Sequence, residues 1–77
     1  MTLSLVVAQN LWTIRSERKL TQGAVAAKAG LSVSYLSMLE HRQRTPSLET
    51  LEKLAKALAV PPLSLFKPSP GPRSRRR

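Results

Sequence analysis

The strongest constraint on the fold comes from the stretch TQGAVAAKAGLSVSYLSMLE, where a single glycine separates two short helix patterns. Thr21 can accept a hydrogen bond from an amide of the first turn, which favours a helix over residues 22–29. Gly30 then supplies the left-handed conformation that closes a helix without a steric penalty from a Cβ atom. Because Ser32 can cap the next helix at once, only a very short turn separates the two helices.

The small and apolar residues of this stretch also fit two closely packed helices. Ala26, in the first helix, is small enough to let the second helix approach. Five further residues are expected to face inward. They are Val25, Ala29, Leu31, Leu36 and Leu39. The stretch therefore has the geometry of a helix-turn-helix, whose second helix, here residues 32–40, can enter the major groove of DNA.

Helix patterns also flank this stretch on both sides. Upstream, apolar residues recur at steps of four, four and three, which predicts a helix with one buried stripe. These residues are Leu3, Val7, Leu11 and Ile14. Trp12 falls off the stripe and is interpreted as a partly exposed ring on the helix flank. The alternative is a ring that packs on the C-terminal segment or on a second subunit. Downstream, Thr45 or Ser47 can cap a further helix, and a final short helical turn is expected at residues 60–66. The apolar face of the downstream helix consists of Leu48, Leu51, Leu54, Ala55 and Leu58.

Length and charge limit the class of protein. The 77 residues suffice for one domain, and 13 Lys and Arg against four acidic residues give a formal charge of +9, which favours a polyanionic partner. Five of the bases lie in the proline-rich segment KPSPGPRSRRR. We therefore expect a folded domain over residues 1–66 and a disordered basic tail over residues 67–77. The tail is either simply solvated or an arm that adds nonspecific phosphate contacts.

The sequence lacks the combinations of residues that catalysis requires. It contains neither Asp nor Cys, and His41 is its only histidine, so no metal site and no nucleophile–base pair is expected. We accordingly predict no enzymatic activity and no cofactor. No apolar run is long enough to cross a membrane, and the N-terminal segment lacks the pattern of a signal peptide, which together lead us to expect a cytoplasmic protein.

The helix-turn-helix stretch and its surroundings, residues 7–66, resemble the Cro/C1-type helix-turn-helix domain, the XRE family of bacterial and phage regulators. This resemblance implies an all-α, lambda-repressor-like fold, a compact bundle of five short helices. It also implies a homodimer that binds a two-fold related operator in double-stranded DNA. An ion pair is implied between Arg15 of the first helix and Glu40 at the end of the third, and a phosphate contact by Arg15 is the alternative. Arg42 and Ala59 replace glycines that are frequent in the family, so each adopts a left-handed backbone or its turn differs.

The resemblance also assigns residues to DNA binding. Gln22 matches a glutamine that anchors a phosphate and braces the reading helix. The positions that face bases or the adjacent backbone hold Ser32, Val33, Ser34, Tyr35, Ser37 and Met38. Val33 and Met38 stand where many relatives have Arg, Gln or Asn, and neither can make bidentate contacts to a base, so we expect them to pack on thymine methyl groups. Arg42 and Arg44, just after the reading helix, are candidate phosphate contacts.

The expected function is sequence-specific, DNA-binding regulation of transcription by a homodimer. The dimer interface is predicted at Val60, Leu65 and Phe66. Repression by occlusion is favoured because the helix over residues 22–29 has no acidic patch. Activation through Glu49 or Glu52 stays open, so a restriction–modification controller and a phage Cro-like regulator both fit. The alternatives are an antitoxin, whose partner would be a toxin, and a protein-interaction module on the same fold. RNA polymerase is a further candidate partner.

Overall fold

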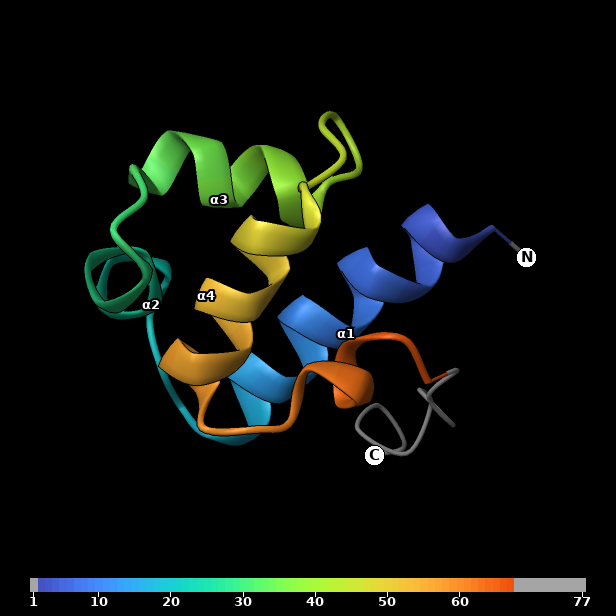
Figure 1. Cartoon of the computed structure of the whole chain (residues 1–77). Helices are drawn as coiled ribbons and strands as arrows, with labels where there is room; N and C mark the ends of the chain where they lie inside the picture. The colour runs from blue at the N-terminus through green and yellow to red at the C-terminus, as the bar shows by residue number, and fades with distance from the viewer. Residues whose placement is uncertain (1, 68–77) are drawn as a thin grey trace.

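The computed structural model describes residues 2–67, and these residues form helices without any β-strand (Figure 1). The elements are α1 (Leu3–Glu17), α2 (Gln22–Ala29), α3 (Val33–Glu40), α4 (Leu48–Leu58) and the 3₁₀ helix η1 (Pro62–Leu65). The all-α prediction is thus confirmed, but the bundle has four α-helices rather than five. The fifth element is a single 3₁₀ turn because Pro61 and Pro62 provide no amide donor, and the following residues bond only three positions back. The predicted tail lies outside the described residues, except for Lys67.

Hydroxyl side chains start all four α-helices. The caps are Thr2, Thr21, Ser32 and Ser47, and each side chain accepts a hydrogen bond from the amide three residues later. The predicted caps of α2 and α3 are therefore confirmed. For α4 the cap is Ser47 and not Thr45, and the cap of α1 was not predicted. Each such bond satisfies an amide that has no partner within its own helix.

Left-handed residues end all four α-helices, and after α1 this residue is Lys19, with a φ of 57°. Gly30 closes α2 with a φ of 73°, as predicted, and its amide bonds back to the last turn. Arg42, one residue beyond the cap of α3, and Ala59, which follows α4, have φ values of 62° and 61°. Arg42 and Ala59 thus adopt the left-handed backbone, as Lys19 does, at a cost of about 1–2 kcal/mol each. The turn after α3 consequently keeps the geometry that a glycine would give it.

The core lies around α4, which packs against α2 and η1, while α1 packs against α3 and η1 (Figure 1). It is aliphatic, as the scarcity of aromatic residues suggests. Its largest fully buried side chains are Leu11, Val25, Leu36, Leu39, Leu54, Leu58 and Leu65. Of the residues expected to face inward between α2 and α3, only Leu31 is not fully buried. The buried contacts of α2 and α3 with α4 and α1 fix the position of the helix-turn-helix within the bundle.

Two residues of the predicted apolar stripes are exposed. Leu3 is 58% exposed and Leu48 is 74% exposed, so their assignment to buried faces was wrong. They are the first residues of α1 and α4, and neighbouring elements do not cover these helix ends. Trp12, by contrast, is about half exposed on the flank of α1, as predicted.

The predicted dimer interface must also be corrected, because Leu65 is completely buried within the single chain. It closes the core beneath α4, and Val60 and Phe66 pack partly against the same core. Asn10 of α1 holds this segment in place: its Nδ2 donates to the carbonyl oxygens of Leu65 at 2.9 Å and Lys67 at 2.8 Å. Leu65 is therefore unavailable to a second copy without unfolding this part of the molecule.

Candidate nucleic-acid interface

The outer face of α3 is the surface that the helix-turn-helix presents to solvent. Leu36 and Leu39 hold the helix to the core on its inner side. The residues on the other side lie at spacings of one and four, which places them on a single face of a helix. They are Val33, Ser34, Ser37 and Met38. Val33 and Ser34 are exposed, and Ser37 and Met38 are half-buried, so the predicted base-facing residues do lie together.

The two remaining residues predicted on this helix have different surroundings. Ser32 is exposed, and its hydroxyl oxygen accepts from the amide of Tyr35 at 3.0 Å, so it acts as the cap of α3. Tyr35 is half-buried, and its ring packs against the core rather than standing on the outer face. Only the part of the ring that remains exposed is available to a phosphate.

A buried network ties the last turn of α3 to α1 and α2. Arg15 donates two parallel hydrogen bonds to the carboxylate of Glu40, from Nε at 2.6 Å and from Nη2 at 3.0 Å. Its Nη1 donates to the carbonyl oxygen of Leu20 at 2.9 Å. The side chains are 15% and 2% exposed, respectively. The predicted partners are thus brought together in the bidentate geometry that makes such pairs strong and directional.

Gln22 joins the same network from the start of α2. Its Nε2 donates to Oε1 of Glu40 at 3.0 Å, so one carboxylate receives bonds from both α1 and α2. An amide nitrogen carries two hydrogens, and the second remains for an external acceptor. Gln22 is half-buried and is therefore placed both to brace α3 and to reach a phosphate beside it.

The basic residues after α3 lie on an ordered loop. The amide of Gln43 bonds to the carbonyl oxygen of Met38 at 2.8 Å, and Nδ1 of His41 lies 2.8 Å from the carbonyl oxygen of Ser37. Arg42 and Arg44 are exposed, and neither forms an ion pair within residues 2–67. Both guanidinium groups are thus available to phosphates next to the end of α3.

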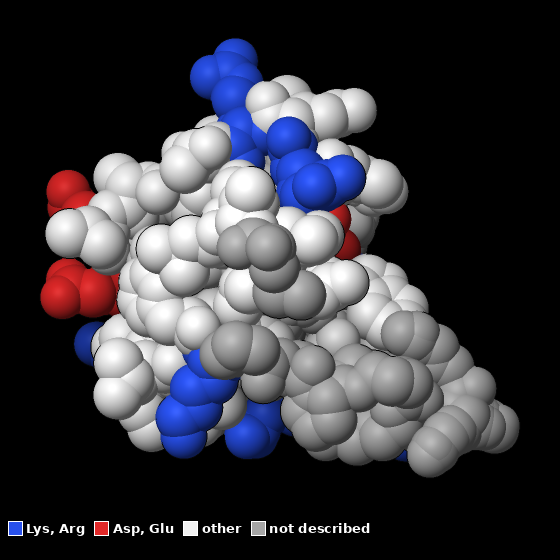
Figure 2. Space-filling model, turned by 90° about the vertical axis from the view of Figure 1, so that its right-hand side faces the viewer, with Lys and Arg blue, Asp and Glu red and all other residues white. Residues whose placement is uncertain are grey.

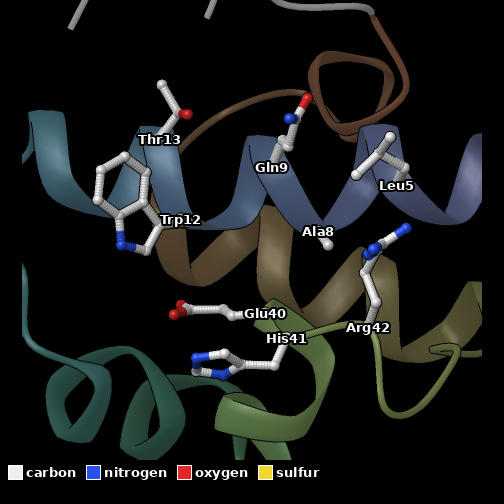
Figure 3. Close-up of a pocket in the computed structure, with 8 residues that line it drawn as sticks. All are labelled: Leu5, Ala8, Gln9, Trp12, Thr13, Glu40, His41 and Arg42. Atoms are coloured by element: carbon white, nitrogen blue, oxygen red, sulfur yellow. The ribbon is translucent and has the colours of Figure 1, made fainter. Parts of the chain in front are cut away.

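A pocket of about 310 Å³, which the sequence did not reveal, opens between α1 and the end of α3 (Figure 3). Figure 3 shows Trp12 on one side, Arg42 on the other, and Glu40 and His41 beneath them. The carboxylate of Glu40 is occupied by Arg15 and Gln22, which leaves it unsuited to acid–base chemistry. The described part of the chain holds no group of three or more metal-binding side chains. It also holds no helix that is long and apolar enough to cross a membrane.

Comparisons with known proteins cover most of the described helices. A family model described as helix-turn-helix matches residues 13–65. An uncharacterized HTH-type transcriptional regulator of Sinorhizobium fredii, y4dJ, is 41% identical over 69 residues, which are 90% of this chain and 90% of the relative. An immunity repressor protein of Bacillus phage phi105 is 50% identical over 56 residues, 73% of this chain. The aligned part is 39% of that repressor, so this chain spans well under half of its length.

A solved structure agrees with the sequence comparisons. The restriction-modification controller protein C.AhdI from Aeromonas hydrophila superposes with a TM-score of 0.79 at 36% sequence identity. The match covers 82% of this chain and 96% of the controller protein. The similarity thus extends over nearly all of the described helices and not only over α2 and α3.

Proposed function

Since the chain belongs to the Cro/C1-type helix-turn-helix family, we infer that it is a non-enzymatic, sequence-specific DNA-binding regulator of transcription. Similarity to an immunity repressor and to an HTH-type transcriptional regulator supports this function. One structural observation is the main support for this function. The outer face of α3 is free, while the buried bonds of Glu40 to Arg15 and Gln22 fix the last turn of the helix.

In this proposal α3 enters the major groove and the surrounding residues hold the phosphates. Val33 and Met38 pack on thymine methyl groups, and Ser34 and Ser37 donate or accept hydrogen bonds at base edges or backbone. Gln22, from one side, and the arginines of the loop, from the other, contact the backbone. Because network bonds hold α3 before DNA arrives, little conformational freedom is lost on binding, which favours affinity.

We further propose that the protein acts as a homodimer on a two-fold related operator. A single reading helix covers about half of such a site, and a second copy supplies the other half roughly 34 Å away, one turn of DNA. The exposed residues of α2 include Ala27 and Lys28 and no acid, which favours repression by occlusion over activation through this helix. The likeness to C.AhdI supports a restriction–modification controller as a second candidate function.

Two variants test which residues contact phosphates and which contact bases. Arg44→Ala is expected to weaken binding to all duplexes by a similar factor and to reduce the slope of affinity against salt by about 1. Met38→Ala is expected to leave that slope unchanged and to alter the ranking of duplexes, because it removes an apolar contact to bases. Titrations of several duplexes at two salt concentrations measure both effects.

Three outcomes of these titrations would oppose the proposal. A re-ranking of duplexes by Arg44→Ala would contradict its assignment to phosphate. Equal, weak affinity of the wild type for every sequence would refute sequence-specific reading. A complete lack of binding would favour the protein-interaction module instead.

A further inference from the structure

The pocket between α1 and the end of α3 combines apolar walls with a charged group at one end. Its volume of about 310 Å³ lies at the lower end of the range of roughly 300–1,000 Å³ that is usual for small-molecule sites. Leu5, Ala8 and Trp12 of α1 form apolar walls, and Arg42 stands at the end opposite Trp12 (Figure 3). A compact ligand with one ring and one charged group matches this combination.

A buried hydroxyl side chain also lines the pocket. Thr13 is 6% exposed, and its side chain forms no hydrogen bond with another residue of the described range 2–67. Asn10, the other buried polar residue of this range, donates to two carbonyl oxygens. Because buried polar groups in native proteins nearly always have a partner, the exception at Thr13 needs an explanation. A polar group of a ligand in the pocket would provide the partner.

Trp12 offers the pocket an aromatic surface. The residue is about half exposed, and Figure 3 shows its ring extending from α1 toward the end of α3. A flat ligand that covers this ring removes apolar surface from water on both partners. Two stacked aromatic rings also gain more than their buried area alone gives. The tryptophan therefore favours an aromatic ligand.

Arg42 is the only lysine or arginine among the described residues that line the pocket. Its guanidinium group forms no ion pair within residues 2–67, and Figure 3 shows the side chain reaching from the loop toward α1. Its backbone has a φ of 62°, a conformation that glycine adopts without strain. Strained residues of this kind cluster at ligand-binding and other functional sites.

The charges around the pocket favour a ligand with a single negative charge. Glu40 also lines the pocket, but Arg15, 2.6 Å away, matches its charge, so Arg42 is left unmatched. Figure 2 shows basic side chains gathered over the upper part of the molecule, where the loop after α3 lies, and most acidic side chains at the left edge. A carboxylate suits the planar guanidinium group, which can donate two parallel bonds to it. A second charge would face Glu40 without a cation of its own.

We propose that the pocket binds a small aromatic monocarboxylate. The ring packs on Trp12, the carboxylate pairs with Arg42, and a hydroxyl substituent on the ring bonds to the hydroxyl group of Thr13. Arg42 cannot pair with this ligand and with a DNA phosphate at the same time. Occupancy of the pocket therefore lowers the affinity for DNA, and this second step rests on the proposed function.

Fluorescence titration with para-hydroxybenzoate tests the pocket without DNA. Trp12 is the only tryptophan of the chain, so its emission reports directly on this site. The change in emission should saturate with a dissociation constant of about 1 mM or lower, as expected for a ligand of this size. Acetate lacks the ring and benzyl alcohol lacks the charge, so each should bind at least tenfold more weakly.

Two arginine variants test the charged end of the pocket. Arg42→Gln is expected to weaken the binding of para-hydroxybenzoate at least tenfold. The matched control is Arg44→Gln, which changes an exposed arginine of the same loop that does not line the pocket, and it should bind this ligand like the wild type. Circular dichroism checks that both variants keep the fold.

Thr13→Val tests the hydroxyl group. The wild type should bind para-hydroxybenzoate severalfold more tightly than benzoate, and the variant should bind the two equally. Valine has nearly the same shape as threonine, and the hydroxyl group has no partner to lose within the described chain. The melting temperature should therefore not fall.

Two results would overturn the pocket as a binding site. One is a wild-type emission that shows no saturable change with para-hydroxybenzoate or benzoate up to tens of millimolar. The other is an equal loss of ligand affinity in Arg42→Gln and Arg44→Gln, which would indicate a general effect of charge.

Titrations of DNA with and without para-hydroxybenzoate separate this inference from the proposed function. Saturating ligand should weaken DNA binding by the wild type severalfold and reduce the slope of affinity against salt by about 1. DNA binding by Arg42→Gln should not respond to the ligand. A wild type that binds the ligand but no duplex would support the pocket and refute the proposed function. DNA affinity that stays unchanged at saturating ligand would overturn the proposed regulation.

Discussion

Glu40→Ala is expected to lower the free energy of unfolding by about 3–5 kcal/mol, because it leaves a nearly buried cation without its partner. The Glu40 side chain is 2% exposed and accepts bonds from Arg15 and Gln22. Without it, the guanidinium group keeps only the carbonyl oxygen of Leu20 as an acceptor. For a chain of this size the loss amounts to roughly 4–8 °C in melting temperature per kcal/mol, so the variant should be partly unfolded at 37 °C. Urea unfolding followed by circular dichroism measures the change.

A matched control is the exposed ion pair of α4. Glu49, 80% exposed, lies 3.8 Å from Lys53, and Glu49→Ala should cost about 1 kcal/mol or less because solvent screens such a pair. A double variant tests whether the unpaired charge causes the loss of stability. Arg15→Met combined with Glu40→Leu removes both charges, so it should be more stable than Glu40→Ala, which leaves the guanidinium group unpaired. If Glu40→Ala and Glu49→Ala changed stability equally, the network would not be what fixes α3.

Val33→Glu is expected to reduce the affinity for DNA at least a hundredfold while the fold stays intact. Val33 is the first residue of α3 and is about half exposed, so a glutamate there suits the helix dipole and removes little packing. On DNA the same carboxylate would lie among phosphates and would replace an apolar contact to bases. Fluorescence anisotropy with a labelled duplex measures the affinity, and thermal unfolding checks the fold.

Leu63→Glu serves as the control, because Leu63 is 67% exposed and the variant adds the same charge on η1, at the opposite end of the bundle from α3 (Figure 1). It should bind DNA nearly as well as the wild type. Equal losses of DNA affinity in the two variants would indicate a general charge effect. Unchanged affinity of Val33→Glu would show that α3 does not contact DNA.

The helix-turn-helix could be predicted closely from the sequence because local chemistry sets its boundaries. Thr21, Gly30 and Ser32 each act within one turn of their own position, through a side-chain cap or a left-handed backbone. At Arg42 and Ala59 the sequence left the turn geometry open, because each replaces a glycine that is frequent in the family, and the structure has a left-handed backbone at both. Interactions of this range do not depend on how the helices are stacked.

Long-range packing could not be predicted in the same way. Leu65 and Leu48 both fit an apolar pattern, yet one is buried and the other is the most exposed large apolar residue described. The difference arises because η1 turns under α4, where Asn10 holds it, whereas the start of α4 lies at the edge of the bundle. Likewise, the resemblance implied the pairing of Arg15 with Glu40, but the bond that Gln22 adds to the same carboxylate depends on three helices meeting at one point.

Selection of bound sequences from a random duplex pool tests the central claim most directly. The account predicts enrichment of a two-fold related site whose half-sites lie about one helical turn apart, with thymine-containing positions at the contacts of Val33 and Met38. The same selection with Val33→Glu should yield no enriched site. A wild-type pool that stays random, or that converges on a single half-site without symmetry, would contradict sequence-specific reading by a homodimer.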